Sequence, residues 1–321
     1  MKKISLLFLL IFIVFLISCT ESQVFEPNVG GVERLLKGSR IIGAPGSNPG
    51  QFMGPAGIAF DHNGNIYIAD YDSNRIIKFT TSGVYLTEFG TTGTGDGELD
   101  APFFLAIDST GKIYVSDSKN DRVQVFSSDG TYLSQFGSTG SGDGQFNYPS
   151  GVAIDKDGNI LVADCINSRI SRFTPDGTFI NNFGDTSKAN PILSWPSGID
   201  VDSLGNIYVA DSTTNRIVKY SHDGKYLTEW GSDSPGDYQL TNIYDVKVGP
   251  WGYIYATHTN NDEIKVFKPT GEFVTKFGKS GIELGDLQYP GGITLDNEGN
   301  IYVTEWTNKR VQKITQKIIS K

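Results

Sequence analysis

The chain has 321 residues, of which 38% are hydrophobic and 20% are charged, so it is long enough to bury a sizeable core. Its 38 glycines, 19 phenylalanines and 15 tyrosines favour short strands and tight turns, and they argue against a helical bundle, a collagen-like chain and a disordered chain. The net charge of −9 repels phosphate backbones, so we expect no binding to nucleic acid.

The first 18 residues have the layout of a secretory signal peptide. Two lysines follow the initiator methionine, and residues 4–17 are apolar apart from one serine, which is shorter than the roughly 20 residues of a membrane-spanning helix. The run ends in Leu16-Ile-Ser-Cys19, which resembles the bacterial lipobox. The resemblance implies lipidation of Cys19 and removal of residues 1–18; the alternative is an uncleaved apolar anchor with an incidental cysteine.

The lipobox resemblance also predicts where the protein resides. It implies a chain anchored in the cell envelope, outside the cytoplasm, through its N-terminal lipid alone. Thr20 follows the cysteine, and the absence of aspartate there favours the outer membrane if the organism has two membranes. Residues 19–39 are polar and contain glycine, so we interpret them as a tether.

Residues 40–321 contain a repeat with a period of 47 residues, which we take as one domain. A Pro-x-Gly-aliphatic motif recurs at starts 55, 102, 149, 196, 243 and 290, and it is altered in the second and fifth copies. Each copy continues with an aromatic- or aliphatic-rich segment that ends in Asp, His or Glu. An Arg-aliphatic pair and then an aromatic-Gly pair follow in most copies.

Each repeat is expected to form four antiparallel strands, which we call a to d. In the first repeat they are predicted at 57–61, 66–69, 75–79 and 85–89, and an Asn-Gly turn joins the first two. Strand b is apolar at consecutive positions, so both of its faces must be covered.

Six such units predict an all-β, six-bladed β-propeller. The last repeat ends without room for strand d, and residues 40–43 match strand d, so the N-terminal segment should close the last blade. An open solenoid would leave exposed strand edges, which favours the closed, monomeric ring.

These motifs resemble the NHL repeat, and the resemblance covers nearly all of the chain after residue 40. It implies the six-bladed fold but leaves function open, because the family includes protein- and RNA-binding propellers, extracytoplasmic sensor domains and a metal-dependent lyase that releases amidated peptides. Related six-bladed folds include lactonases. Several histidines ligate the metal of that lyase, and this chain has only three histidines, which are predicted on opposite faces, so its chemistry does not carry over.

The residues that directly follow strand b in each repeat form a ring around the predicted propeller. Such a ring could bind a cation. Alternatively, each side chain caps its own loop or pairs with a nearby arginine, and repetition in every blade favours this interpretation. The members are Asp70, Asp117, Asp164, Asp211, His258 and Glu305.

Departures from the repeat are better indicators of a site, because a structural need should recur in every blade. They concentrate in blades 2, 5 and 6, and an aromatic and polar mixture of this kind suits a small ligand or a sugar; drift in a tolerant repeat is the alternative. The candidate ligand-binding residues are Phe103, Phe104, Tyr244, Asp245, His258, Glu305 and Trp306.

No nucleophile-His-acid set is evident, and Cys165 is interpreted as a small structural thiol. We therefore expect a non-catalytic binding propeller that recognises an envelope protein, a peptide or a glycan through the face of the d–a and b–c loops, with no cofactor. The alternative is a lactonase- or lyase-like enzyme that holds a divalent cation at the channel mouth. Its candidate ligands are Asp245, His258 and Glu305.

Overall fold

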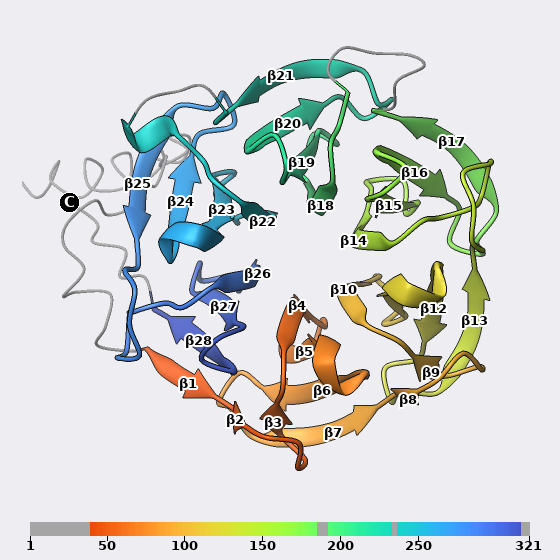
Figure 1. Cartoon of the computed structure of the whole chain (residues 1–321), viewed down its shortest axis with the longest axis horizontal. Helices are drawn as coiled ribbons and strands as arrows, with labels where there is room; N and C mark the ends of the chain where they lie inside the picture. Colours follow the sequence, from red (N-terminus) through yellow and green to blue (C-terminus); the bar gives the residue numbers. More distant parts are fainter. Residues whose placement is uncertain (1–38, 185–191, 233–235, 316–321) are drawn as a thin grey trace, which may run out of the picture.

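The computed structural model describes residues 39–184, 192–232 and 236–315. The predicted signal peptide, Cys19 and most of the predicted tether lie outside the described residues. Within those described, the chain is an all-β, six-bladed propeller in which each blade is a four-stranded antiparallel sheet (Figure 1). The fold class predicted from the repeat is confirmed.

The first three blades follow the 47-residue repeat. Their strands are β4 (Pro55–Phe60), β5 (Asn65–Asp70), β6 (Arg75–Thr80) and β7 (Tyr85–Phe89); β10 (Pro102–Ile107), β11 (Ile113–Asp117), β12 (Arg122–Phe126) and β13 (Tyr132–Phe136); and β14 (Pro149–Ile154), β15 (Ile160–Asp164), β16 (Arg169–Phe173) and β17 (Phe179–Phe183).

The next two blades have the same order. Their strands are β18 (Pro196–Val201), β19 (Ile207–Asp211), β20 (Arg216–Tyr220) and β21 (Tyr226–Trp230); and β22 (Ile243–Val248), β23 (Ile254–His258), β24 (Glu263–Phe267) and β25 (Phe273–Phe277).

The sixth blade joins the two ends of the chain. It consists of β26 (Pro290–Leu295), β27 (Ile301–Glu305), β28 (Arg310–Ile314) and the N-terminal strand β1 (Arg40–Ile42). Strand β1 pairs antiparallel with β28, and Ile42 lies opposite Val311. The prediction that residues 40–43 close the last blade is confirmed at β1, and the closure leaves no blade incomplete.

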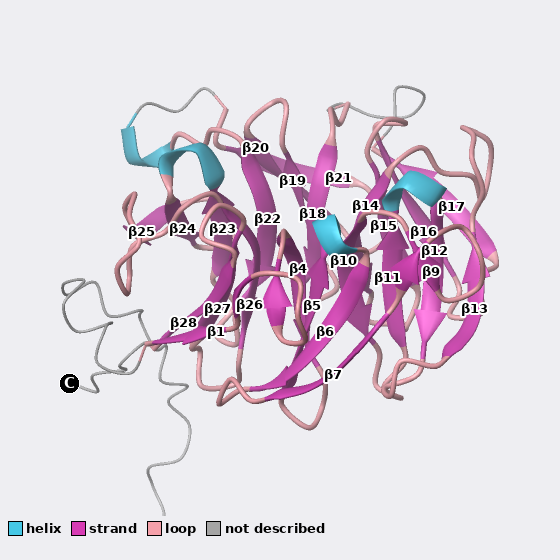
Figure 2. Cartoon of the chain, turned by 60° about the horizontal axis from the view of Figure 1, so that its bottom comes forward, coloured by secondary structure: helices cyan, strands magenta, loops and turns pink. Residues whose placement is uncertain are grey.

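Short elements connect the blades. The connectors after blades 6 and 1 contain the parallel pairs β2 (Ala44–Pro45) with β3 (Gln51–Phe52) and β8 (Thr91–Thr92) with β9 (Glu98–Leu99). The 3₁₀ turns η2 (Tyr71–Ser73), η3 (Ser118–Asn120) and η5 (Thr259–Asn261) follow strand b, and η4 (Gly236–Tyr238) lies in a connector. Figure 2 shows these turns on one side of the disc.

The hydrophobic core lies between neighbouring blades. Tyr114 and Val125 of blade 2, for example, pack in one buried cluster with Val152 and Val162 of blade 3. Five further clusters join the other neighbouring pairs, including blade 6 with blade 1. Strand b is therefore covered on both faces, as its unbroken apolar sequence predicts.

Strand a lines the central axis and begins two residues earlier than predicted. Pro55 pairs with Asp70, and a bulge follows before Ile58; a proline is compatible with a strand at its first residue. The glycine of the motif allows adjacent strands a to approach. A Cβ atom on Gly151 would lie 2.1 Å from the carbonyl oxygen of Ser197 in the next blade.

Candidate functional site

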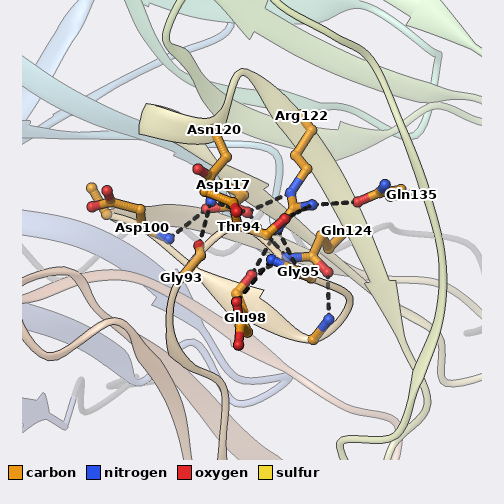
Figure 3. Close-up of polar contacts among 12 residues, drawn as sticks. Gly93, Thr94, Gly95, Glu98, Asp100, Asp117, Asn120, Arg122, Gln124 and Gln135 are labelled. Carbon is orange, nitrogen blue, oxygen red and sulfur yellow. Dashed lines mark hydrogen bonds and ion pairs between the residues drawn. The ribbon is translucent and has the colours of Figure 1, made fainter.

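The acidic residue at the end of strand b fixes the connector that precedes its blade. In blade 2, Asp117 accepts hydrogen bonds from the backbone N–H of Asp100 at 2.7 Å and from Nε of Arg122 at 2.7 Å. The same guanidinium donates to the carbonyls of Thr94, Gly95 and Glu98 at 2.8–2.9 Å (Figure 3). Asp117 is fully buried, so its charge is stabilised by these donors instead of water.

The same arrangement, which we call the latch, recurs in other blades. Arg169 pairs with Asp164 and donates to three connector carbonyls, and Arg310 does so with Glu305. The structure therefore assigns these carboxylates to capping and arginine pairing, the second of the two sequence interpretations. It also gives the Gly-rich connectors a structural role, because the carbonyls of Gly95 and Gly142 accept hydrogen bonds from the guanidinium groups.

Blade 5 builds its latch with the charges rearranged. Glu263 takes the place of the arginine, and Lys265 donates to the connector carbonyls of Asp237 and Gln239 at 3.1 and 2.6 Å. His258 lies between Thr241 Oγ1, 2.5 Å from its Nε2, and Glu263. Burial, together with the charge of Lys265, lowers the pKa of His258 to about 4, so the ring is neutral at pH 7.

Asp245 replaces a motif glycine and is buried between blades 5 and 6. Its two carboxylate oxygens accept hydrogen bonds from the backbone N–H of Val246 at 2.8 Å and of Ile293 at 2.9 Å. Burial raises the pKa of Asp245 to about 7. Blade 2 has the other altered motif, in which Phe104 replaces the glycine and packs against Phe103.

Aromatic side chains gather around the central axis on the face of the d–a and b–c loops. Phe103 of blade 2 contacts Tyr244 of the opposite blade 5, with ring centroids 5.3 Å apart, so the two rings meet across the central axis. Tyr71 packs on Phe103 at 5.4 Å and on Trp306 at 5.2 Å. Four of the sequence candidates, Phe103, Phe104, Tyr244 and Trp306, thus lie in one cluster.

Further aromatic residues surround this cluster. The hydroxyl groups of Tyr71 and Tyr148 are 2.6 Å apart, and Tyr148 packs on Trp195 at 6.0 Å. Tyr289 occupies the position in blade 6 that Tyr148 occupies in blade 3. We name this set the aromatic mouth: Tyr71, Phe103, Tyr148, Trp195, Tyr244, Tyr289 and Trp306.

The family models that match this sequence coincide with blades of the structure. The NHL repeat model matches residues 52–79, 193–220 and 287–314, and each match ends within or at the end of strand c. A second family model, described as a 6-bladed beta-propeller, matches residues 105–183.

The chain contains NHL repeats and folds into a six-bladed propeller.

Solved structures share this fold at low sequence identity. A streptogramin B lyase is 17% identical, with a TM-score of 0.64 over 88% of this chain and 99% of that chain. Virginiamycin B lyase from Staphylococcus aureus, in an inactive form with quinupristin, is 20% identical, with a TM-score of 0.63 over 88% and 87%. A putative gluconolactonase is 15% identical, with a TM-score of 0.64 over 91% and 98%. No curated protein matched the sequence significantly.

The NHL propeller holds its neighbouring blades together with a small side chain after strand b. Ser118 and Ser212 donate to the first carbonyl of the next blade at 2.6 and 2.5 Å, Thr259 does so at 2.8 Å, and Cys165 Sγ lies 2.8 Å from the carbonyl oxygen of Pro196. Each such bond contributes about 0.5–1.5 kcal/mol. Cys165 is buried, which raises the pKa of its thiol, so it is the structural thiol that the sequence predicts.

Sequence reasoning missed four members of the aromatic mouth. Tyr71 occupies the position of the small bonding residue, as Trp306 does, and Tyr148, Trp195 and Tyr289 precede strand a. Aligning the six repeats position by position would have found them. In the remaining blades, the residues equivalent to Tyr71 are Ser, Cys or Thr, and those equivalent to Tyr148 are Gly, Ala or Asn.

The proposed metal ligands lie in separate hydrogen-bond networks of the NHL propeller. Asp245 binds backbone N–H groups, His258 lies against Thr241 and Glu263, and Glu305 belongs to the latch of blade 6. Across the described residues, no group of three or more His, Cys, Asp or Glu side chains is placed to hold a metal ion. In the same ranges, no helix is both long and apolar enough to cross a bilayer.

Proposed function

We propose that this chain is a non-catalytic binding propeller of the cell envelope, held outside the cytoplasm by a lipid on Cys19, and that its ligand is a protein, a peptide or a glycan. The observation that carries the proposal is the aromatic mouth. Its rings come from all six blades or from the connectors that precede them, and they converge on one face, although the repeat would place small residues at most of these positions. Large aromatic side chains with polar tips are typical of binding surfaces.

Rigidity supports the same proposal. The latches fix the connectors, and in every blade the N–H of the residue after strand b donates to the carbonyl of the residue before strand a, from Tyr71 to Gly54 in blade 1 through Trp306 to Tyr289 in blade 6. A preorganised surface loses little conformational entropy when it binds.

A capture experiment tests the proposal. Residues 23–321, which include all described strands, would be immobilised and exposed to an envelope extract. We expect retention of one or more components by the natural chain, and loss of retention when Tyr244→Ser and Trp306→Thr are combined, since both replacements have counterparts in other blades. The control is Tyr226→Ser, which replaces an exposed tyrosine on the outer strand of blade 4, outside the aromatic mouth. Equal retention by all three proteins would exclude the aromatic mouth as the site.

A further inference from the structure

We propose that the aromatic mouth binds a neutral saccharide. This inference rests on the proposed function and narrows its ligand to one chemical class. Three features carry it: aromatic side chains held at backbone positions that do not favour them, hydrogen-bond donors without partners beside exposed ring faces, and a balance of charge around the rim.

The first feature is the backbone before strand a. The residue there adopts a left-handed conformation, with φ of 59° at Tyr148, 61° at Trp195 and 53° at Tyr289. Bulky residues are rare in this region, whereas asparagine tolerates it, as Asn242 does in blade 5. Strained residues of this kind persist mainly at functional sites. The turn itself therefore does not require aromatic side chains at these three positions.

The second feature is the pairing of ring faces with free donors. Trp195 is 41% exposed and Tyr289 is 38% exposed, so part of each ring is open to solvent. Within the described residues, no hydrogen bond satisfies the hydroxyls of Tyr244 and Tyr289 or the indole N–H of Trp306, and none of the three is a buried orphan. A pyranose ring presents a face of C–H groups, which packs on aromatic rings, and an edge of hydroxyls, which need such donors.

The third feature is charge. Lys119 pairs with Asp100 at 3.4 Å, and its ammonium lies 6.0 Å from the centre of the Tyr71 ring. Asp72, which directly follows Tyr71, interacts with Lys119 and with Lys309. The ammonium of Lys119 is therefore offset by the carboxylate of Asp100 beside the Tyr71 ring. The whole chain is acidic, with a net charge of −9, so a neutral saccharide is favoured over an anionic one.

An extended peptide fits this surface less well. Extended peptides that add a strand to a sheet edge pair with unsatisfied backbone groups. At the mouth, the backbone carbonyls before strand a already accept hydrogen bonds from the following loops, for example Tyr148 from Cys165 and Trp195 from Ser212. What remains available is side-chain surface: ring faces, hydroxyls and indole N–H groups.

Calorimetric titration tests the inference. The probes are hexamers of glucose, xylose, mannose and N-acetylglucosamine, with oligogalacturonate as the anionic comparison. Residues 23–321 would be compared with the double variant Trp195→Asn, Tyr289→Asn and with the control Tyr226→Asn on the outer strand. We expect at least one neutral hexamer to bind, the double variant to bind it about tenfold or more weakly, and the control to match the natural chain.

The double variant also separates binding from stability. Asparagine suits the left-handed backbone, so its thermal midpoint should equal or exceed that of the natural chain; weaker binding together with a lowered midpoint would indicate a structural role and count against the inference. Absence of binding by every neutral hexamer, or tighter binding of oligogalacturonate, would overturn it. If envelope proteins were nevertheless captured through Tyr244 and Trp306, the proposed function would stand and only the saccharide would be excluded.

Discussion

The buried carboxylate of Asp245 is expected to make the propeller less stable as the pH rises. Its oxygens contact two backbone N–H groups, and the nearest charged groups are Lys247 and Asp200, which form an ion pair with each other at 3.1 Å. Desolvation dominates these contacts and raises the pKa of Asp245 to about 7, from 3.8 for the free side chain. Between pH 3.8 and about pH 7, Asp245 therefore keeps a proton in the folded protein that it releases in the unfolded chain.

The magnitude follows from this difference of about 3 pH units, since each unit corresponds to 1.36 kcal/mol. The unfolded chain binds fewer protons than the folded one in this window, so the free energy of unfolding decreases with pH. The contribution of Asp245 is full below about pH 4 and is lost above about pH 7, with a total change of up to about 4 kcal/mol.

Urea unfolding across this pH range measures the effect. Asp245→Gly restores the motif glycine and removes the carboxylate, so relative to the natural chain it should gain stability by up to about 4 kcal/mol between about pH 4 and about pH 8. Phe104→Gly restores the same glycine in blade 2 without removing a charge, and its profile should run parallel to that of the natural chain. Parallel profiles for Asp245→Gly would refute the reasoning, because the carboxylate would then titrate alike in both states.

Three further predictions concern the latch, the anchor and the metal. Arg122→Ala should lower the free energy of unfolding by about 3–5 kcal/mol, because Asp117 is left as a buried charge; Arg75→Ala should cost less, since Arg75 Nε lies 3.6 Å from Asp70. Cys19→Ser should yield a chain that takes up no labelled fatty acid and leaves the membrane fraction, and retention by an uncleaved helix would contradict this. Elemental analysis of residues 23–321, purified without chelator, should find no stoichiometric divalent ion, and finding one would favour a metal-dependent enzyme.

The fold could be predicted because each blade repeats the same physical requirements. An apolar strand b returns every 47 residues, and a motif glycine, an acid and an arginine return in most copies, so one interpretation extends to all six blades. The closing strand was predictable because Arg40–Ile42 supply the strand that the last repeat lacks. The first residue of strand a was harder to predict from the sequence, since the bulge after Pro55 depends on the pairing of Pro55 with Asp70.

The candidate site was predictable only in part. Phe103, Phe104, Tyr244 and Trp306 depart from the repeat, and the structure brings them together. His258 departs as well, but with Glu263 and Lys265 it rebuilds a latch. Sequence comparison alone does not distinguish a substitution that compensates for its neighbours from one that points into a shared site. That distinction requires the contacts.

Photo-crosslinking in the cells that make this chain tests the central claim most directly. A benzophenone side chain would be placed at position 289 in the aromatic mouth or at position 226 on the outer strand of blade 4, where Tyr289 and Tyr226 are 38% and 40% exposed. We predict adducts from position 289 and none from position 226. Adducts from position 226 alone, or from both positions equally, would contradict the assignment of binding to the aromatic mouth.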